Sequence, residues 1–146
     1  MFKLQDKIAL LSAAIALLSA IYARYSYSQA KKANQLVFHG LIKPIFVAFD
    51  ELALHMDSCG KYADKTTVQK FLPHKRDAAI YLDKKTSEYI NEYWRACFYM
   101  ADLSQQSKAG QTSDEQNKKI IEFEAVERKL SPIIKKRIKK KLTVAL

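Results

Sequence analysis

The uncharged stretch from Ile8 to Ala23 limits what this chain can fold into more than any other feature. It contains sixteen residues, IALLSAAIALLSAIYA, and lies between Lys7 and Arg24. A helix that crosses a bilayer needs about 20 apolar residues, with a lower limit of roughly 17. Lys7 and Arg24 lengthen the usable span, because their aliphatic stems can lift both charges to the lipid headgroups. The pattern predicts a single transmembrane helix.

Aromatic side chains mark the C-terminal edge of this stretch. Tyrosine rings favour the membrane–water interface, where the ring meets lipid and the hydroxyl meets water. The residues expected to anchor the helix at the two interfaces are Lys7, Tyr22, Arg24, Tyr25 and Tyr27.

Two other structures share this pattern. A signal peptide also has a cationic start and a short apolar core, but cleavage after Ala20 would require a small residue where Leu18 stands. A short apolar run can also be the buried helix of a soluble protein. We favour an uncleaved membrane anchor, and the sequence leaves the question of cleavage open.

The distribution of cations around the helix indicates its orientation. Lys and Arg prefer the cytoplasmic side of a membrane. Lys3 and Lys7 precede the apolar stretch, whereas Arg24, Lys31 and Lys32 follow it. This small excess predicts that the residues after the helix form a cytoplasmic body.

The apolar stretch repeats itself, because the sequence IALLSA begins at Ile8 and again at Ile15. Small residues on one helix face let backbones approach closely in lipid, and serine hydroxyls can hydrogen-bond across the contact. The alternative is that these small residues have no partner. We expect a homo-oligomer through one seam, which consists of Ala9, Ser12, Ala16, Ser19 and Ala23.

Replacing Ala16 and Ser19 with isoleucine should abolish self-association, because branched side chains would hold two helices apart. A genetic reporter of association between membrane helices measures the effect. Association that persists in the double variant would show that the seam carries no contact.

The remaining chain indicates an all-α fold. It has only three glycines and three prolines, and helix formers dominate without the alternating pattern of strands. We predict an N-terminal transmembrane helix in residues 1–30, a small antiparallel helical bundle in 31–127 and a basic amphipathic C-terminal segment in 128–146. The first expected body helix restarts near Leu41 or Ile42, with Pro44 in its first turn, and ends at Gly60. Two short helices follow, 67–72 halted by Pro73 and 78–82 capped by Asp77. A long helix capped by Thr86 or Ser87 ends at 108–110, and a last helix begins behind two capping boxes, Thr112 with Glu115 and Ser113 with Gln116.

The net charge of +10 is concentrated at the C-terminus, where residues 128–146 hold eight Lys or Arg and no acid. This segment continues the last helix or is kinked at Pro132. Ile134, Ile138 and Leu142 repeat every four residues, so cations flank an apolar ridge that favours a membrane surface, although the ridge could instead cover the bundle. The cations meet anionic lipid, nucleic acid or only solvent. The residues expected to contact lipid or nucleic acid are Lys135, Lys136, Arg137, Lys139, Lys140 and Lys141.

The segment from Ser28 to Phe49 carries an Ala33-Asn34 pair, then His39 and the run IFVAF at residues 45–49. Together with the preceding anchor, this pattern resembles small bacterial single-pass membrane proteins that have no assigned function. The resemblance implies one span in the bacterial inner membrane and offers no reaction.

No pattern of catalytic residues is visible. Glu51 and His55 lie four residues apart on a helix, but a metal site needs three or four ligands, so we interpret them as a solvated pair. His39 is expected to be structural. Cys59 and Cys97 lack metal-binding spacing and are expected to be reduced thiols. We predict no catalytic residue, no cofactor and no metal.

These features predict a non-enzymatic, membrane-tethered helical interaction module that self-associates and lays its basic tail on anionic lipid. The expected partners are the lipid bilayer, a second copy and an unknown protein, and nucleic acid is the less favoured partner. Two alternatives stay open: a membrane-perturbing, toxin-like effector, and a membrane-held nucleic-acid-binding protein. The sequence identifies neither the biological process nor the number of copies in an oligomer.

Overall fold

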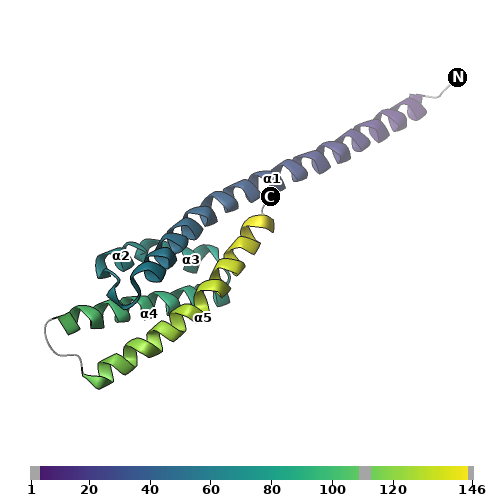
Figure 1. Ribbon diagram of the computed structural model, residues 1–146. Helices are drawn as coiled ribbons and strands as arrows, with labels where there is room; N and C mark the ends of the chain where they lie inside the picture. Colours follow the sequence, from purple (N-terminus) through teal and green to yellow (C-terminus); the bar gives the residue numbers. More distant parts are fainter. Residues whose placement is uncertain (1–3, 109–112, 145–146) are drawn as a thin grey trace. The chain divides into compact units, whose positions relative to one another are not determined.

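The computed structural model describes residues 4–108 and 113–144, and every regular element among them is a helix. The prediction of an all-α chain is therefore confirmed for the described residues (Figure 1). In chain order, the elements are α1 (Leu4–Cys59), the 3₁₀ turn η1 (Gly60–Tyr62), α2 (Lys65–Lys70), α3 (Leu72–Tyr81), α4 (Lys84–Lys108) and α5 (Asp114–Val144).

The chain divides into two compact units, residues 1–37 and residues 38–146. The first unit, here called the N-terminal arm, contains the beginning of α1, and every residue from Ile8 to Ala23 is exposed. An 18-residue window of this helix has a mean hydropathy of 1.7 and no buried residue, so the helix is long and apolar enough to cross a membrane. The second unit, here called the helical body, contains the rest of α1 and all other helices.

α1 is one continuous helix through Gly40 and Pro44, so the predicted interruption before Ile42 is wrong. Pro44 has no N–H and leaves one helix hydrogen bond unmade, the bond to the Gly40 carbonyl. Ile42 and Ile45 are almost completely buried. Burial of two isoleucines contributes about 3–6 kcal/mol, which offsets the roughly 3 kcal/mol that an internal proline costs. Gly60 ends α1 as predicted, with a left-handed φ of +51°.

The core of the helical body joins one face of α1 to α4 and α5. At its centre, the Phe49 ring of α1 lies with its centroid 4.9 Å from that of Tyr93 in α4 and 6.1 Å from that of Phe71. Such tilted and edge-on pairs add to the energy of burial. The other large apolar residues of the core are Ile42, Ile45, Leu52 and Met56 of α1, Val68 of α2, Leu82 before α4, Ile90, Cys97 and Met100 of α4, and Ile120, Leu130, Ile134 and Ile138 of α5.

The connection from α1 to α4 contains more helix than the sequence predicts. Asp64 caps α2 by accepting the Thr67 N–H at 2.9 Å. Pro73 stands in the first turn of α3 and does not halt a helix. Proline is tolerated there because the N–H that it lacks would have no partner in a first turn. The predicted cap at Asp77 is wrong, because Asp77 lies inside α3.

Asp83 begins α4. Its carboxylate accepts the Thr86 N–H at 3.2 Å, so it occupies the capping position that we assigned to Thr86 or Ser87. Aspartate is among the preferred residues at this position. α4 ends at Lys108, and residues 109 and 110 lie outside the described residues.

A capping box begins α5. The Ser113 N–H donates to Gln116 Oε1 at 3.1 Å, and the Gln116 N–H donates to Ser113 Oγ at 3.2 Å. This predicted pair is confirmed. The other predicted box, Thr112 with Glu115, involves Thr112, which lies outside the described residues.

The basic tail is part of the core and not a separate segment. α5 runs unbroken through Pro132 to Val144. Ile134 and Ile138 are fully buried, so the apolar ridge covers the helical body and is not available to lipid while the body is folded. Residues 38–146, which include the basic tail, belong to one compact unit. A core-facing stripe and a lipid-facing stripe have the same spacing, which is why the pattern alone did not separate them.

Candidate functional site

The N-terminal arm presents the predicted seam on its surface. Ala9, Ser12, Ala16, Ser19 and Ala23 are all exposed. The Ser19 hydroxyl donates to the Ile15 carbonyl, one turn earlier, at 2.8 Å. Its hydrogen bond is therefore already satisfied within its own helix. The predicted interface anchors are exposed as well, and they are Lys7, Tyr22, Arg24, Tyr25 and Tyr27.

Half of the predicted tail cations form ion pairs with the helical body. Lys135 Nζ lies 2.8 Å from Asp50 Oδ1 of α1. Arg137 Nη2 lies 2.8 Å from Asp83 Oδ2, and Lys141 Nζ lies 3.5 Å from Asp83 Oδ1. These three cations fasten α5 to α1 and to the beginning of α4.

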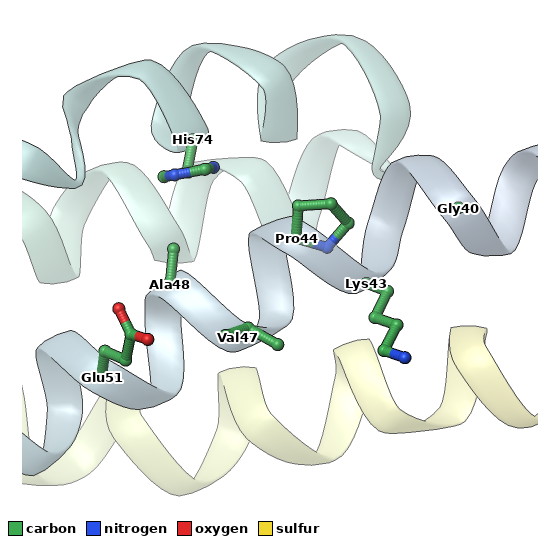
Figure 2. A pocket seen from close by; sticks show the side chains of 7 residues that line it. All are labelled: Gly40, Lys43, Pro44, Val47, Ala48, Glu51 and His74. Atoms are coloured by element: carbon green, nitrogen blue, oxygen red, sulfur yellow. The ribbon is translucent and has the colours of Figure 1, made fainter.

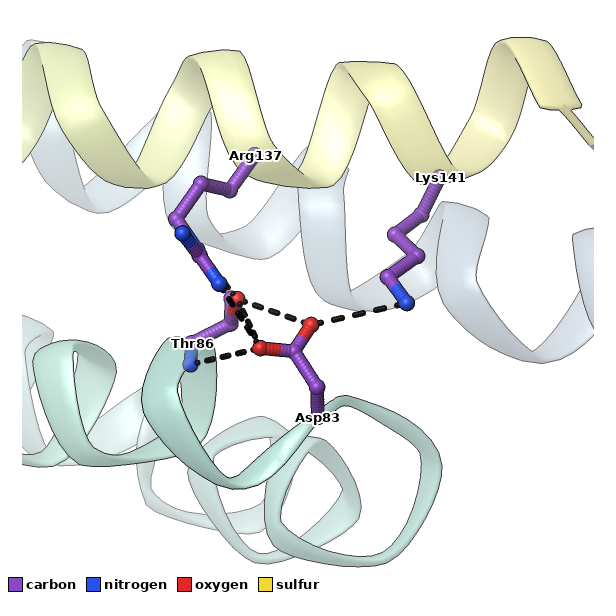
Figure 3. A network of polar contacts seen from close by, with 4 residues as sticks. All are labelled: Asp83, Thr86, Arg137 and Lys141. Atoms are coloured by element: carbon purple, nitrogen blue, oxygen red, sulfur yellow. Dashed lines mark hydrogen bonds and ion pairs between the residues drawn. The ribbon is translucent and has the colours of Figure 1, made fainter.

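The contacts of Asp83 form a compact network (Figure 3). Arg137 donates through Nη2 to Asp83 Oδ2 at 2.8 Å and through Nε to Thr86 Oγ1 at 2.7 Å. The Thr86 hydroxyl, which is fully buried, donates to the Asp83 carboxylate at 3.0 Å. One carboxylate thus caps α4 and receives two cations of α5.

These contacts change the acidity of Asp83. Partial burial raises the pKa of this carboxyl, but the hydrogen bonds from Arg137 and Thr86 and the charge of Arg137 outweigh burial and lower the pKa well below its usual range. Asp83 is therefore ionised at every physiological pH.

The other tail cations, Lys136, Lys139 and Lys140, are exposed. Lys139 Nζ lies 5.8 Å from the centroid of the Phe46 ring. Lys84 and Lys85 are also exposed, and they directly follow Asp83, which holds Arg137 and Lys141. We call the resulting surface the basic end; it consists of Lys84, Lys85, Lys136, Arg137, Lys139, Lys140 and Lys141.

Sequence reasoning missed the contribution of Lys84 and Lys85 to this surface. Both lie more than forty positions before the start of the tail at Arg128, and the contacts of Asp83 with Arg137 and Lys141 bring them to it. The available signal was a capping carboxylate, Asp83, that two lysines directly follow.

The predicted pair of Glu51 with His55 does not form. His55 Nε2 accepts the Asp64 N–H at 3.1 Å, and His55 Nδ1 lies 3.8 Å from Cys59 Sγ. His55 therefore joins the end of α1 to the start of α2. No group of three or more possible metal ligands occurs among the described residues.

A buried carboxyl lies in the core. Glu127 is 5% exposed, and its Oε1 accepts the Tyr93 hydroxyl at 3.0 Å. Burial raises the pKa of Glu127, and the nearby charge of Asp57 adds to this effect. Burial likewise raises the pKa of the Cys97 thiol. Both cysteines are free, as predicted, and the raised pKa makes Cys97 a poor nucleophile.

An open groove of about 410 Å³ lies beside α1 (Figure 2). Pro44, Val47 and Ala48 give it an apolar floor, and His74 of α3 lies across from them. Figure 2 shows Lys43 pointing away from His74. Glu51 of α1 also lines the groove.

No protein-family model matches this chain, and no similar curated protein or solved structure was found.

Asp83→Asn and Asp83→Ala should separate the charge of the network from its capping role. Asparagine caps a helix about as well as aspartate, so Asp83→Asn removes only the ion pairs and should lower the free energy of unfolding by about 1 kcal/mol. Alanine also removes the cap and should cost about 1 kcal/mol more. Urea unfolding of the full chain in an uncharged detergent, followed by circular dichroism, measures both changes.

The same stability difference, measured at decreasing pH, tests whether the charge of Asp83 is responsible. Because the folded state lowers the pKa of Asp83, its contribution is fully present above the unfolded pKa of about 3.9 and is lost as the pH falls toward the lowered value. The stability difference between the natural chain and Asp83→Asn should shrink below about pH 4. A constant difference down to about pH 2 would contradict the assigned role of the charge.

Proposed function

We propose that this chain is a non-enzymatic, membrane-tethered interaction module. In this proposal the N-terminal arm crosses the bacterial inner membrane once and associates with a second copy through its seam. The helical body, an antiparallel bundle, lies in the cytoplasm and turns its basic end to anionic lipid.

The observation that supports the tether is the exposure of the N-terminal arm. Leu10, Leu17 and Leu18 are 72%, 65% and 66% exposed, and no residue of the apolar window is buried. Apolar surface costs roughly 25 cal/mol per Å² when it faces water. A bilayer removes this cost along the whole stretch from Ile8 to Ala23, in which every residue is exposed.

Two properties of the basic end support contact with lipid. Lys84, Lys85 and Lys140 of the basic end are exposed. Each cation near an anionic leaflet contributes about 1 kcal/mol to membrane binding. Only residues 25–37 separate the apolar stretch from the helical body, so a tether in the membrane raises the effective concentration of lipid around the body. Nucleic acid attracts the same charges, but a tether does not bring it close.

The tether predicts that the full chain with a C-terminal tag remains in the membrane pellet after carbonate extraction from bacterial cells. The tag should also resist protease that is added from the periplasmic side, because the body lies in the cytoplasm. Immunoblotting of the fractions measures both results and shows whether the chain keeps its full length.

A matched pair of variants controls this experiment. Leu11→Lys with Leu18→Lys should release the protein, because each lysine costs roughly 3 kcal/mol in a membrane helix. Leu54→Lys with Ile80→Lys changes two comparably exposed apolar residues of the body and should leave the protein in the pellet. A natural chain that is soluble or shortened would refute the anchor.

Contact of the basic end with lipid predicts slower acetylation of its lysines on an anionic membrane. The full chain is placed in lipid nanodiscs, either neutral or anionic, and mass spectrometry follows the reaction of each lysine. Anionic lipid should slow the acetylation of Lys84, Lys85 and Lys140 about threefold, and the difference should disappear at about 1 M salt, where charges are screened.

Lys61, Lys70 and Lys118 are exposed lysines outside the basic end and serve as internal controls in the same molecule. Equal slowing of both groups, or no slowing, would refute the proposed contact. Stronger protection by a short nucleic acid duplex than by anionic lipid would favour the nucleic-acid alternative.

A further inference from the structure

The helical body has a second cationic surface, which shares no residue with the basic end. Lys75 and Arg76 of α3 and Arg95 of α4 form it. None of the three has an ion pair with an acid among the described residues. Asp77, next to Arg76, and Glu92, three residues before Arg95, form no ion pair within the described part of the chain. We call these three residues the α3–α4 cation cluster.

The position of Lys75 is fixed by its neighbours. Its Nζ donates to Asn91 Oδ1 at 3.0 Å and lies 4.2 Å from the centroid of the Trp94 ring. Trp94 is itself held, because its indole N–H donates to the Val68 carbonyl at 3.1 Å and its ring stacks on Phe98. A charge that is already in place loses little conformational freedom when a ligand binds.

The surroundings of Lys75 disfavour its positive charge. Partial burial lowers the pKa of Lys75, and the charges of Arg76 and Arg95 lower it further. Elsewhere in the body, Asp50, Asp83 and Asp102 each neutralise a cation from another helix. The α3–α4 cation cluster has no such acid, so an anion from outside would relieve the repulsion within it.

We propose that the α3–α4 cation cluster binds an acidic segment of a partner protein, with carboxylates lying against Arg76 and Arg95. Guanidinium groups present parallel N–H donors that match the two oxygens of a carboxylate. Single-stranded bases fit less well, because they bind by stacking on aromatic rings, and Lys75 and Phe98 already lie against the Trp94 ring. The proposal of an acidic protein partner rests on the proposed role of the chain as an interaction module, but it does not require that the basic end contacts lipid.

Fluorescence tests the proposal directly, because Trp94 is the only tryptophan of the chain. The full chain in an uncharged detergent is titrated with an octaglutamate peptide. Binding beside Lys75 should change the emission of Trp94 in a saturable way, and the apparent affinity should fall as salt screens the charges. An octaglutamine peptide, which has the same length without side-chain charge, should give no saturable change.

Variants locate the binding surface. Arg76→Gln with Arg95→Gln should weaken octaglutamate binding about tenfold. Lys61→Gln with Lys118→Gln removes the same charge from exposed positions elsewhere and should change the affinity less than about twofold. Circular dichroism checks that both double variants keep their helices.

Three results would overturn the proposal: no saturable change with octaglutamate, equal weakening by the two double variants, or tighter binding of an oligothymidylate than of octaglutamate. The acetylation experiment on the basic end measures different lysines with a different ligand. Failure of the peptide titration and failure of lipid contact can therefore be told apart.

Discussion

The burial of one face of α1 is the interaction on which the helical body depends. Phe49 is fully buried between Tyr93 and Phe71, and Ile42, Ile45 and Met56 continue the same face. The energy of removing apolar surface from water is roughly proportional to area and does not depend on what covers it. The second part of α1 is covered by protein, whereas the apolar residues before Arg24 are not. One helix therefore has two apolar surfaces that need two different environments.

Placement of the acids determines where positive charge remains available. Asp50, Asp83 and Asp102 are each directed at a cation of another helix, so Lys135, Arg137 and Lys65 stabilise the packing of the body. The cations without an acid from another helix include Lys136, Lys139 and Lys140 of the basic end and all three residues of the α3–α4 cation cluster. A net charge of +10 says little about function by itself; its division between paired and unpaired cations is more informative.

Local patterns in the sequence predicted the parts of the fold that local physics determines. Gly60 marked the end of α1, and Ser113 with Gln116 marked the start of α5. Proline was misread twice, because Pro44 and Pro73 are compatible with a helix in these positions. Whether proline ends a helix depends on the burial around it, which distant residues decide.

The candidate surfaces were predictable only in part for the same reason. The tail cations are contiguous in the sequence, so Lys136, Lys139 and Lys140 were identified. Asp83 forms ion pairs with Arg137 and Lys141, more than fifty residues later in the chain. These pairs engage two of the predicted tail cations and bring Lys84 close to the tail. The α3–α4 cation cluster joins residues of two helices around Trp94, and no short motif marks it. Fold class followed from composition, whereas the surfaces followed from tertiary contacts.

Burial of Glu127 under the Tyr93 hydroxyl gives the body an acid response opposite to that of Asp83. Because the folded state raises the pKa of Glu127, folding takes up a proton between the unfolded and folded values, and rising pH weakens the body. Asp83 acts in the reverse sense, because folding releases its proton and falling pH weakens the body. Folding therefore adds a proton to Glu127 and removes one from Asp83. Together these two carboxyls stabilise the folded body most in mildly acidic solution.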